Sequence, residues 1–126
     1  MAMQNPYARY KTEAILNASQ EELTLMLFDG ALKFCNQAIQ AAEDNQGEKA
    51  YALVTRVQNI IEEFQITLDH AYPIAKDLDQ IYDYLFKQLA VGGSKGDLTV
   101  LKEITAHLRT LRDTWKQAMV IAKRQR

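Results

Sequence analysis

Few side chains in this 126-residue chain are suited to imidazole or thiol chemistry, since it has two histidines and one cysteine. Neither His70 nor His107 follows a glutamate at the Glu-x-x-His spacing that binds iron or manganese in helical bundles. Cys35 stands alone, so it can form no internal disulfide and no paired-cysteine redox or zinc site. We therefore expect no metal and no cofactor, and a reducing compartment suits the lone thiol.

Three closely spaced aspartates, Asp77, Asp79 and Asp83, suggest a calcium-binding loop at first sight. A calcium-binding loop of that type needs glycine at its sixth position and an acid at its twelfth. Those positions hold Tyr82 and Gln88. The aspartates are better interpreted as first-turn acids and part of a solvated helix face.

No catalytic arrangement emerges from the remaining residues. Glu62 and Glu63 are adjacent, hence about 100° apart on a helix, and do not converge on one substrate atom. Phosphate-binding loops and nucleophile elbows are absent from the sequence. A four-helix phosphotransfer domain with His107 as acceptor is an alternative, but Arg109 lies on another helix face and offers no cation beside it. We expect that the protein is not an enzyme.

Composition favours one globular domain spanning residues 1–126. Hydrophobic residues make up 48% and charged residues 25%, and the formal net charge is −1, which disfavours nucleic acid as a partner. The chain has no run of about 18 apolar residues, and its start lacks the apolar core of a secretion signal. We expect a cytoplasmic protein without stable membrane insertion.

Turn and capping signals divide the chain into four long helices. Ser19 followed by Glu22 forms a capping box that starts the first helix, and Gly47 is expected to close it in a left-handed conformation. Pro73 stops the second helix, and Asp97 caps the fourth after a glycine-rich connection. The expected helices span about residues 20–44, 48–71, 74–91 and 98–123, after an N-terminal cap segment, 1–18.

Apolar residues at steps of three and four mark one side of the second and fourth helices. Such stripes with short connections are typical of an antiparallel up-down four-helix bundle, which is the all-α fold that we expect. The helix at 74–91 is broader, because Ile81, Tyr82 and Tyr84 add to its stripe. Its tyrosines suit either a core rim or an interface edge.

Helix 20–44 differs from the others because it carries two apolar stripes. One runs from Leu27 to Ala41, and the second includes Leu25, Phe28, Leu32, Cys35 and Ile39. Either this helix is the central one, or its surplus surface is covered by the N-terminal segment or by a partner. Gly30 in mid-helix costs about 1 kcal/mol relative to alanine, which suggests the close approach of another backbone.

Several segments in order resemble a known family across almost the whole chain. They read NPY at 5–7, ASQEELTLMLFDGA at 18–31, QNII at 58–61, LDQIYDYL at 78–85 and LRDTW at 111–115. Together they resemble the FliS family, the flagellar secretion chaperones for flagellin. The resemblance implies a cytoplasmic four-helix bundle that binds the disordered C-terminal segment of flagellin, prevents its premature polymerisation and delivers it to the flagellar type III export apparatus.

The same resemblance implies that the N-terminal segment covers an apolar groove until flagellin binds. We therefore expect partner contacts from that segment, from the second stripe of helix 20–44 and from one tyrosine of helix 74–91. These residues are Pro6, Tyr7, Tyr10, Ile15, Leu16, Leu25, Phe28, Gly30, Leu32, Cys35, Ile39 and Tyr82. The alternative function is a general helical adaptor for another flagellar or regulatory protein. Without client, two copies of the chain could close the exposed groove as a homodimer.

Overall fold

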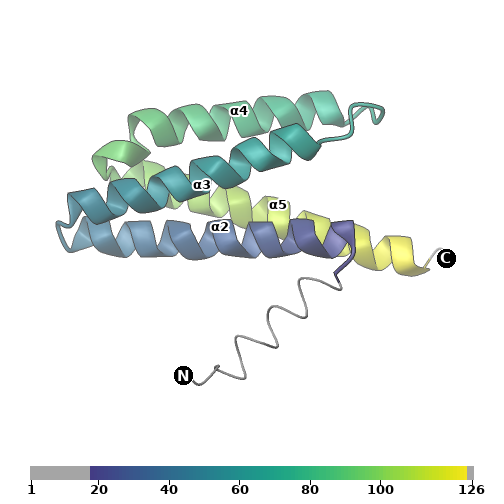
Figure 1. The fold of residues 1–126 in the computed structure, drawn as a ribbon, viewed down its shortest axis with the longest axis horizontal. Coiled ribbons are helices and arrows are strands. Elements are labelled where there is room, and N and C mark those ends of the chain that lie inside the picture. Colours follow the sequence, from purple (N-terminus) through teal and green to yellow (C-terminus); the bar gives the residue numbers. More distant parts are fainter. Residues whose placement is uncertain (1–17, 125–126) are drawn as a thin grey trace, which may run out of the picture.

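The computed structural model describes residues 18–124, which form four α-helices and one short 3₁₀ helix (Figure 1). The elements are α2 (Gln20–Glu43), α3 (Gly47–Thr67), α4 (Ala75–Val91), η1 (Gly93–Lys95) and α5 (Leu98–Arg124). The expected all-α helical bundle is confirmed.

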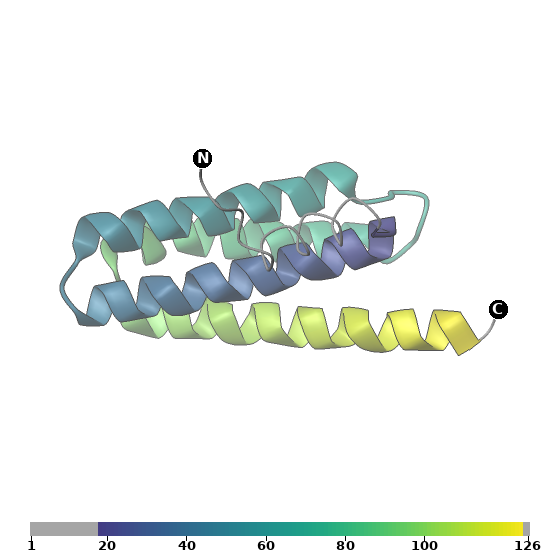
Figure 2. The same cartoon turned by 60° about the horizontal axis from the view of Figure 1, so that its bottom comes forward.

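Successive helices run in opposite directions and lie beside one another, as Figures 1 and 2 both show. The first, α2, packs along both α3 and α5, whereas α4 packs against α3 and, less closely, against α5. The yellow end of α5 extends beyond the start of α2 (Figure 2). This arrangement makes α2 the helix with two closely packed neighbours.

Local side-chain bonds fix where α2 and α5 begin. The Ser19 hydroxyl accepts a hydrogen bond from the amide of Glu22 at 3.2 Å, as the capping box predicts. The Asp97 carboxylate accepts from the amide of Val100 at 3.2 Å and caps α5. Both bonds satisfy backbone donors that the first helical turn leaves without partners.

Two expected helix ends are wrong. Asn45, with φ of 59°, adopts the left-handed conformation after α2, whereas Gly47 already begins α3; asparagine tolerates that conformation because its side chain is short and polar. The second helix was expected to reach residue 71 but ends at Thr67, because Leu68 is extended. The Asp69 carboxylate then accepts a hydrogen bond from the backbone amide of Ala71 at 2.9 Å. This bond stabilises a local turn that competes with continuation of the helix.

The core contains a row of three aromatic rings from three helices. Phe64 of α3 lies between Phe28 of α2 and Tyr82 of α4, with centroid distances of 4.4 Å and 5.5 Å. Aliphatic side chains fill the remainder, with Leu85, Leu89 and Leu108 fully buried. Of the buried residues in this core, α2 and α3 contribute six each and α4 and α5 three each, so packing of the apolar stripes of all four helices holds them together.

Candidate partner-binding groove

Four of the residues expected to bind a partner are core residues in this arrangement. Phe28, Leu32 and Cys35 of α2 are 2%, 5% and 1% exposed, and Tyr82 of α4 is 6% exposed. Burial raises the pKa of the Cys35 thiol to about 11 and that of the Tyr82 hydroxyl to about 12. A partner could contact these side chains only if helices moved apart.

Of the other expected residues on α2, all are half-buried. Leu25 and Ile39 retain part of their surface, and Ile39 packs against the core. A Cβ atom built on Gly30 would lie 3.9 Å from Cδ1 of Ile60, an ordinary contact distance. Among residues 18–124, the expected close approach of another backbone at Gly30 is therefore not found. The two apolar stripes of α2 are covered largely by α3 and α5, as befits the central helix.

The expected contacts in the N-terminal segment lie outside the described residues. They are Pro6, Tyr7, Tyr10, Ile15 and Leu16. Their role as a cap or as partner contacts remains a prediction.

The structure brings a different set of apolar side chains to the surface, in a groove between α4 and α5. The groove has a volume of about 470 Å³, and Ile81 and the half-buried Leu111 provide its apolar surface, while Leu85, which also borders it, is fully buried. Its full lining comprises Asp77, Gln80, Ile81, Tyr84, Leu85, His107, Thr110 and Leu111. Because α4 packs less closely against α5 than α2 does, this hollow is left open along the bundle.

A polar cluster lies at one end of this groove. The Tyr84 hydroxyl of α4 donates to Oε1 of Glu103 on α5 at 2.9 Å, and Nε2 of His107 lies 3.7 Å from the same oxygen. The rings of Tyr84 and His107 meet edge to face at 6.2 Å. The bond to Glu103 raises the pKa of the Tyr84 hydroxyl.

This cluster also bears on the phosphotransfer alternative. A phosphoryl donor brings negative charge, and the Glu103 carboxylate beside His107 would repel it. The nearest groups around the imidazole are thus an aromatic ring and a carboxylate rather than a cation. These surroundings of His107 do not favour phosphoryl transfer.

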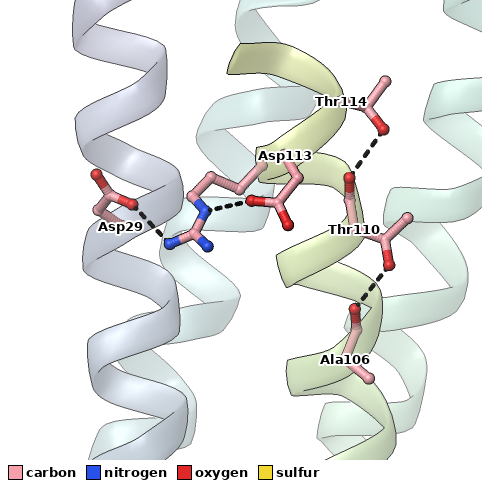
Figure 3. Close-up of polar contacts among 6 residues, drawn as sticks. Asp29, Ala106, Thr110, Asp113 and Thr114 are labelled. Atoms are coloured by element: carbon pink, nitrogen blue, oxygen red, sulfur yellow. Dashed lines mark hydrogen bonds and ion pairs between the residues drawn. The ribbon is translucent and has the colours of Figure 1, made fainter. Parts of the chain in front are cut away.

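A second polar contact fixes α5 against α2, on another face. The Arg112 guanidinium donates to Asp113 at 3.0 Å and to Asp29 of α2 at 3.3 Å. Figure 3 shows Asp29 and Asp113 on their two helices, joined through this guanidinium. Both acids raise the pKa of Arg112, with the bond to Asp113 as the larger cause. The contact between Arg112 and Asp29 joins α5 to α2, and neither residue lines the groove.

Exposed apolar side chains also gather towards the end of the bundle where α2 begins. They lie on the α3–α4 connection and its flanks and near the end of α5, and comprise Ile66, Tyr72, Ile74, Val120 and Ile121.

Within residues 18–124, the structure has no group of histidine, cysteine or acidic side chains able to hold a metal ion. The helices within this part of the chain lack the combination of length and hydropathy that a membrane span requires.

Sequence reasoning noted the breadth of α4 but selected Tyr82, which faces the core. Ile81 and Tyr84, the groove residues, flank it in the sequence. The available signal was the spacing of Ile81, Tyr84 and Leu85, three and four residues apart, which sets these side chains on one face. The periodic stripe could not show that α5 leaves this face partly uncovered.

Comparisons with known proteins find one family and several relatives that bear its name. The family described as "Flagellar protein FliS" matches residues 3–122. The chain is 36% identical to the flagellar secretion chaperone FliS of Bacillus subtilis (strain 168), over all of this chain and 95% of that protein. It is 29% identical to the protein of the same name from Escherichia coli (strain K12), over 90% of this chain and 87% of that one. These relatives are named as chaperones, which implies a non-enzymatic role and a client protein.

Proposed function

The chain belongs to the FliS family of flagellar secretion chaperones, and on that premise we propose that its client is flagellin. It binds the disordered C-terminal segment of flagellin in the cytoplasm and keeps it from polymerising before export. The observation that carries this proposal is the apolar groove between α4 and α5 on a chain with this family membership. The groove gives a client helix a place to bury its apolar side.

A disordered segment loses conformational entropy when it folds on a partner, so the chaperone must offer apolar surface in compensation. Ile81 and Leu111 provide such surface in a groove flanked by two helices. An amphipathic client helix would fit there with side chains at i, i+3, i+4 and i+7 as anchors. Bound in this way, the segment is unavailable for contacts with other flagellin molecules.

The N-terminal segment is proposed as a lid that competes with the client. It joins α2 at the end of the bundle where Ile66, Tyr72 and Ile74 are exposed. Being part of the same chain, it has a high effective concentration near the bundle and lowers the net affinity for flagellin. Competition at the export apparatus, assisted by this lid, releases the client without ATP.

The test is calorimetry with a synthetic peptide of the C-terminal segment of flagellin from the same bacterium. We expect binding in the micromolar range or tighter, a negative heat-capacity change and a gain of helix by circular dichroism. A peptide of the same composition in scrambled order is the control. Absence of binding at micromolar concentrations would overturn the proposal.

The adaptor alternative is tested by capture from a lysate of motile cells, where flagellin should dominate the bound proteins. Capture of another flagellar or regulatory protein, with flagellin absent, would favour the adaptor. Sedimentation of the client-free protein tests whether it forms a homodimer, and a dimer that closes the same groove should dissociate on adding the flagellin peptide.

A further inference from the structure

The three aspartates of α4 have three different environments. Asp79 accepts a hydrogen bond from Nε2 of Gln65 on α3 at 3.2 Å, and Asp83 forms an ion pair with Lys87 at 2.8 Å. Asp77 instead lines the groove between α4 and α5. Among residues 18–124 its carboxylate forms no hydrogen bond or ion pair, so it is available to a ligand in the groove.

The rest of the groove lining offers no positive charge near Asp77. The residues of α5 in this lining are His107, Thr110 and Leu111. The Thr110 hydroxyl already donates to the carbonyl of Ala106 at 3.1 Å, a bond drawn in Figure 3. His107 lies by the Glu103 carboxylate, at the end of the groove marked by Tyr84. The groove is therefore apolar along its middle, with one unpaired carboxylate towards the opposite end.

We propose that this groove selects a helix that carries a lysine or arginine beside its apolar anchors, with the cation seated at Asp77. The inference rests on the proposed function and specifies which part of the flagellin C-terminal segment enters the groove. An acidic residue at the same place of the client would face Asp77 and be repelled.

The spacing of the lining residues sets the register of such a helix. Asp77 and Tyr84 are seven residues apart on α4, which corresponds to about 10 Å, or two helical turns. Apolar side chains at i and i+3 or i+4 can therefore cover Ile81 and the exposed ring of Tyr84, with the cation one turn from Ile81. The selected stretch of client is short and amphipathic and basic at one end.

Asp77 also has a structural role that must be separated from ligand binding. It is the third residue of α4, where a carboxylate interacts favourably with the positive end of the helix dipole. That interaction stabilises the folded protein whether or not a client is present. Stability and client affinity must therefore be measured on the same variants.

The experiment uses calorimetry with the flagellin C-terminal peptide and the variants Asp77→Asn and Asp77→Lys. Asp83→Asn is the matched control, because Asp83 lies on the same helix but pairs with Lys87 outside the groove lining. Because an exposed ion pair contributes little free energy, we expect Asp77→Asn to lose about two- to fivefold in affinity at low salt. We expect a larger loss for Asp77→Lys. The difference from wild type should shrink at about 0.5 M salt, and Asp83→Asn should bind as wild type does.

A second arm identifies the cation by replacing each lysine or arginine of the peptide with glutamine. One such peptide should bind the wild type more weakly than the unaltered peptide does. The same two peptides should bind Asp77→Asn with equal affinity, because the ion pair is already lost in that variant. If wild type binds and both Asp77 variants bind equally well, the inference is overturned while the proposed function stands. If the wild-type protein does not bind the peptide, the proposed function itself fails.

Discussion

The indole nitrogen of Trp115 donates a hydrogen bond to the carbonyl oxygen of Glu21 at 3.0 Å. This bond joins α5 to the first turn of α2, two segments far apart in the sequence. It fixes α5 just before the helix extends past the bundle, at the point where the N-terminal segment joins α2. Since Trp115 is the only tryptophan of the chain, its fluorescence reports on this junction.

Replacing Trp115 with phenylalanine should lower the free energy of unfolding by about 1 kcal/mol or somewhat more, because the bond is lost with part of the packed surface. Urea unfolding followed by circular dichroism measures this without the tryptophan signal. Tyr51→Phe is the control, since Tyr51 is largely exposed and should leave stability unchanged. Equal stability of Trp115→Phe and wild type would mean that the bond contributes nothing.

Placing a charge in the groove should block the client without unfolding the bundle. Ile81 lines the groove and is 39% exposed, so Ile81→Asp should weaken binding of the flagellin peptide by at least about tenfold. Ile66→Asp is the matched control, because Ile66 is 77% exposed and lies outside the groove lining. Equal losses for both variants, or no loss for Ile81→Asp, would move the binding surface elsewhere.

The buried thiol makes stability fall at alkaline pH. Burial raises the pKa of Cys35 from 9.0 to about 11, so the unfolded chain loses this proton at a lower pH than the folded one does. The stabilisation is complete below pH 9 and is lost as pH rises towards 11, by about 2 kcal/mol at pH about 10.5.

Urea unfolding of wild type and Cys35→Ala at pH about 8 and 10.5 isolates this effect, because the other alkaline groups titrate in both proteins. The variant should be less stable at the lower pH, owing to the cavity, and the gap should narrow at the higher pH. A gap that stays constant would show that the thiol titrates alike in the folded and unfolded chain.

Removing the central ring of the aromatic row should be far more costly than removing an exposed one. Phe64→Ala should lose about 3–5 kcal/mol of stability, because Phe28 and Tyr82 would border a cavity. Tyr51→Ala should lose little. Thermal unfolding by circular dichroism compares them, and a small effect at Phe64 would contradict a close-packed core.

The lid proposal predicts opposite effects on stability and affinity. The double variant Tyr7→Ala, Tyr10→Ala should destabilise the free protein, while affinity for the flagellin peptide rises or stays unchanged. Calorimetry and thermal unfolding of the same preparation give both numbers. A large loss of affinity would instead identify these tyrosines as direct client contacts.

Much of the fold follows from local signals in the sequence. Ser19 and Asp97 mark helix starts by side-chain bonds to nearby amides, and such bonds depend only on residues a few positions away. The end of α3 was harder to predict, because Asp69 forms a turn before Pro73 acts. The left-handed residue after α2 was misassigned to glycine when asparagine could adopt the same conformation.

The surface was less predictable than the fold, since exposure depends on how closely helices approach. Two apolar stripes on α2 looked like surplus surface, but Cys35 and Leu32 are buried because α2 has close neighbours on both sides. Ile81 looked like one more member of a core stripe, yet it lines a groove because α4 and α5 are less closely packed. Stripe width alone does not distinguish a central helix from a docking helix.

The pairing of α2 with α5 has a consequence for synthesis of the protein. The ribosome makes α2 first and α5 last, so the side of α2 that faces α5 stays uncovered until nearly the whole chain has been translated. The hydrogen bonds of Trp115 to Glu21 and of Arg112 to Asp29 cannot form before α5 has been translated. The nascent chaperone therefore passes through a state with an uncovered apolar helix, the kind of surface that it is proposed to shield in its client.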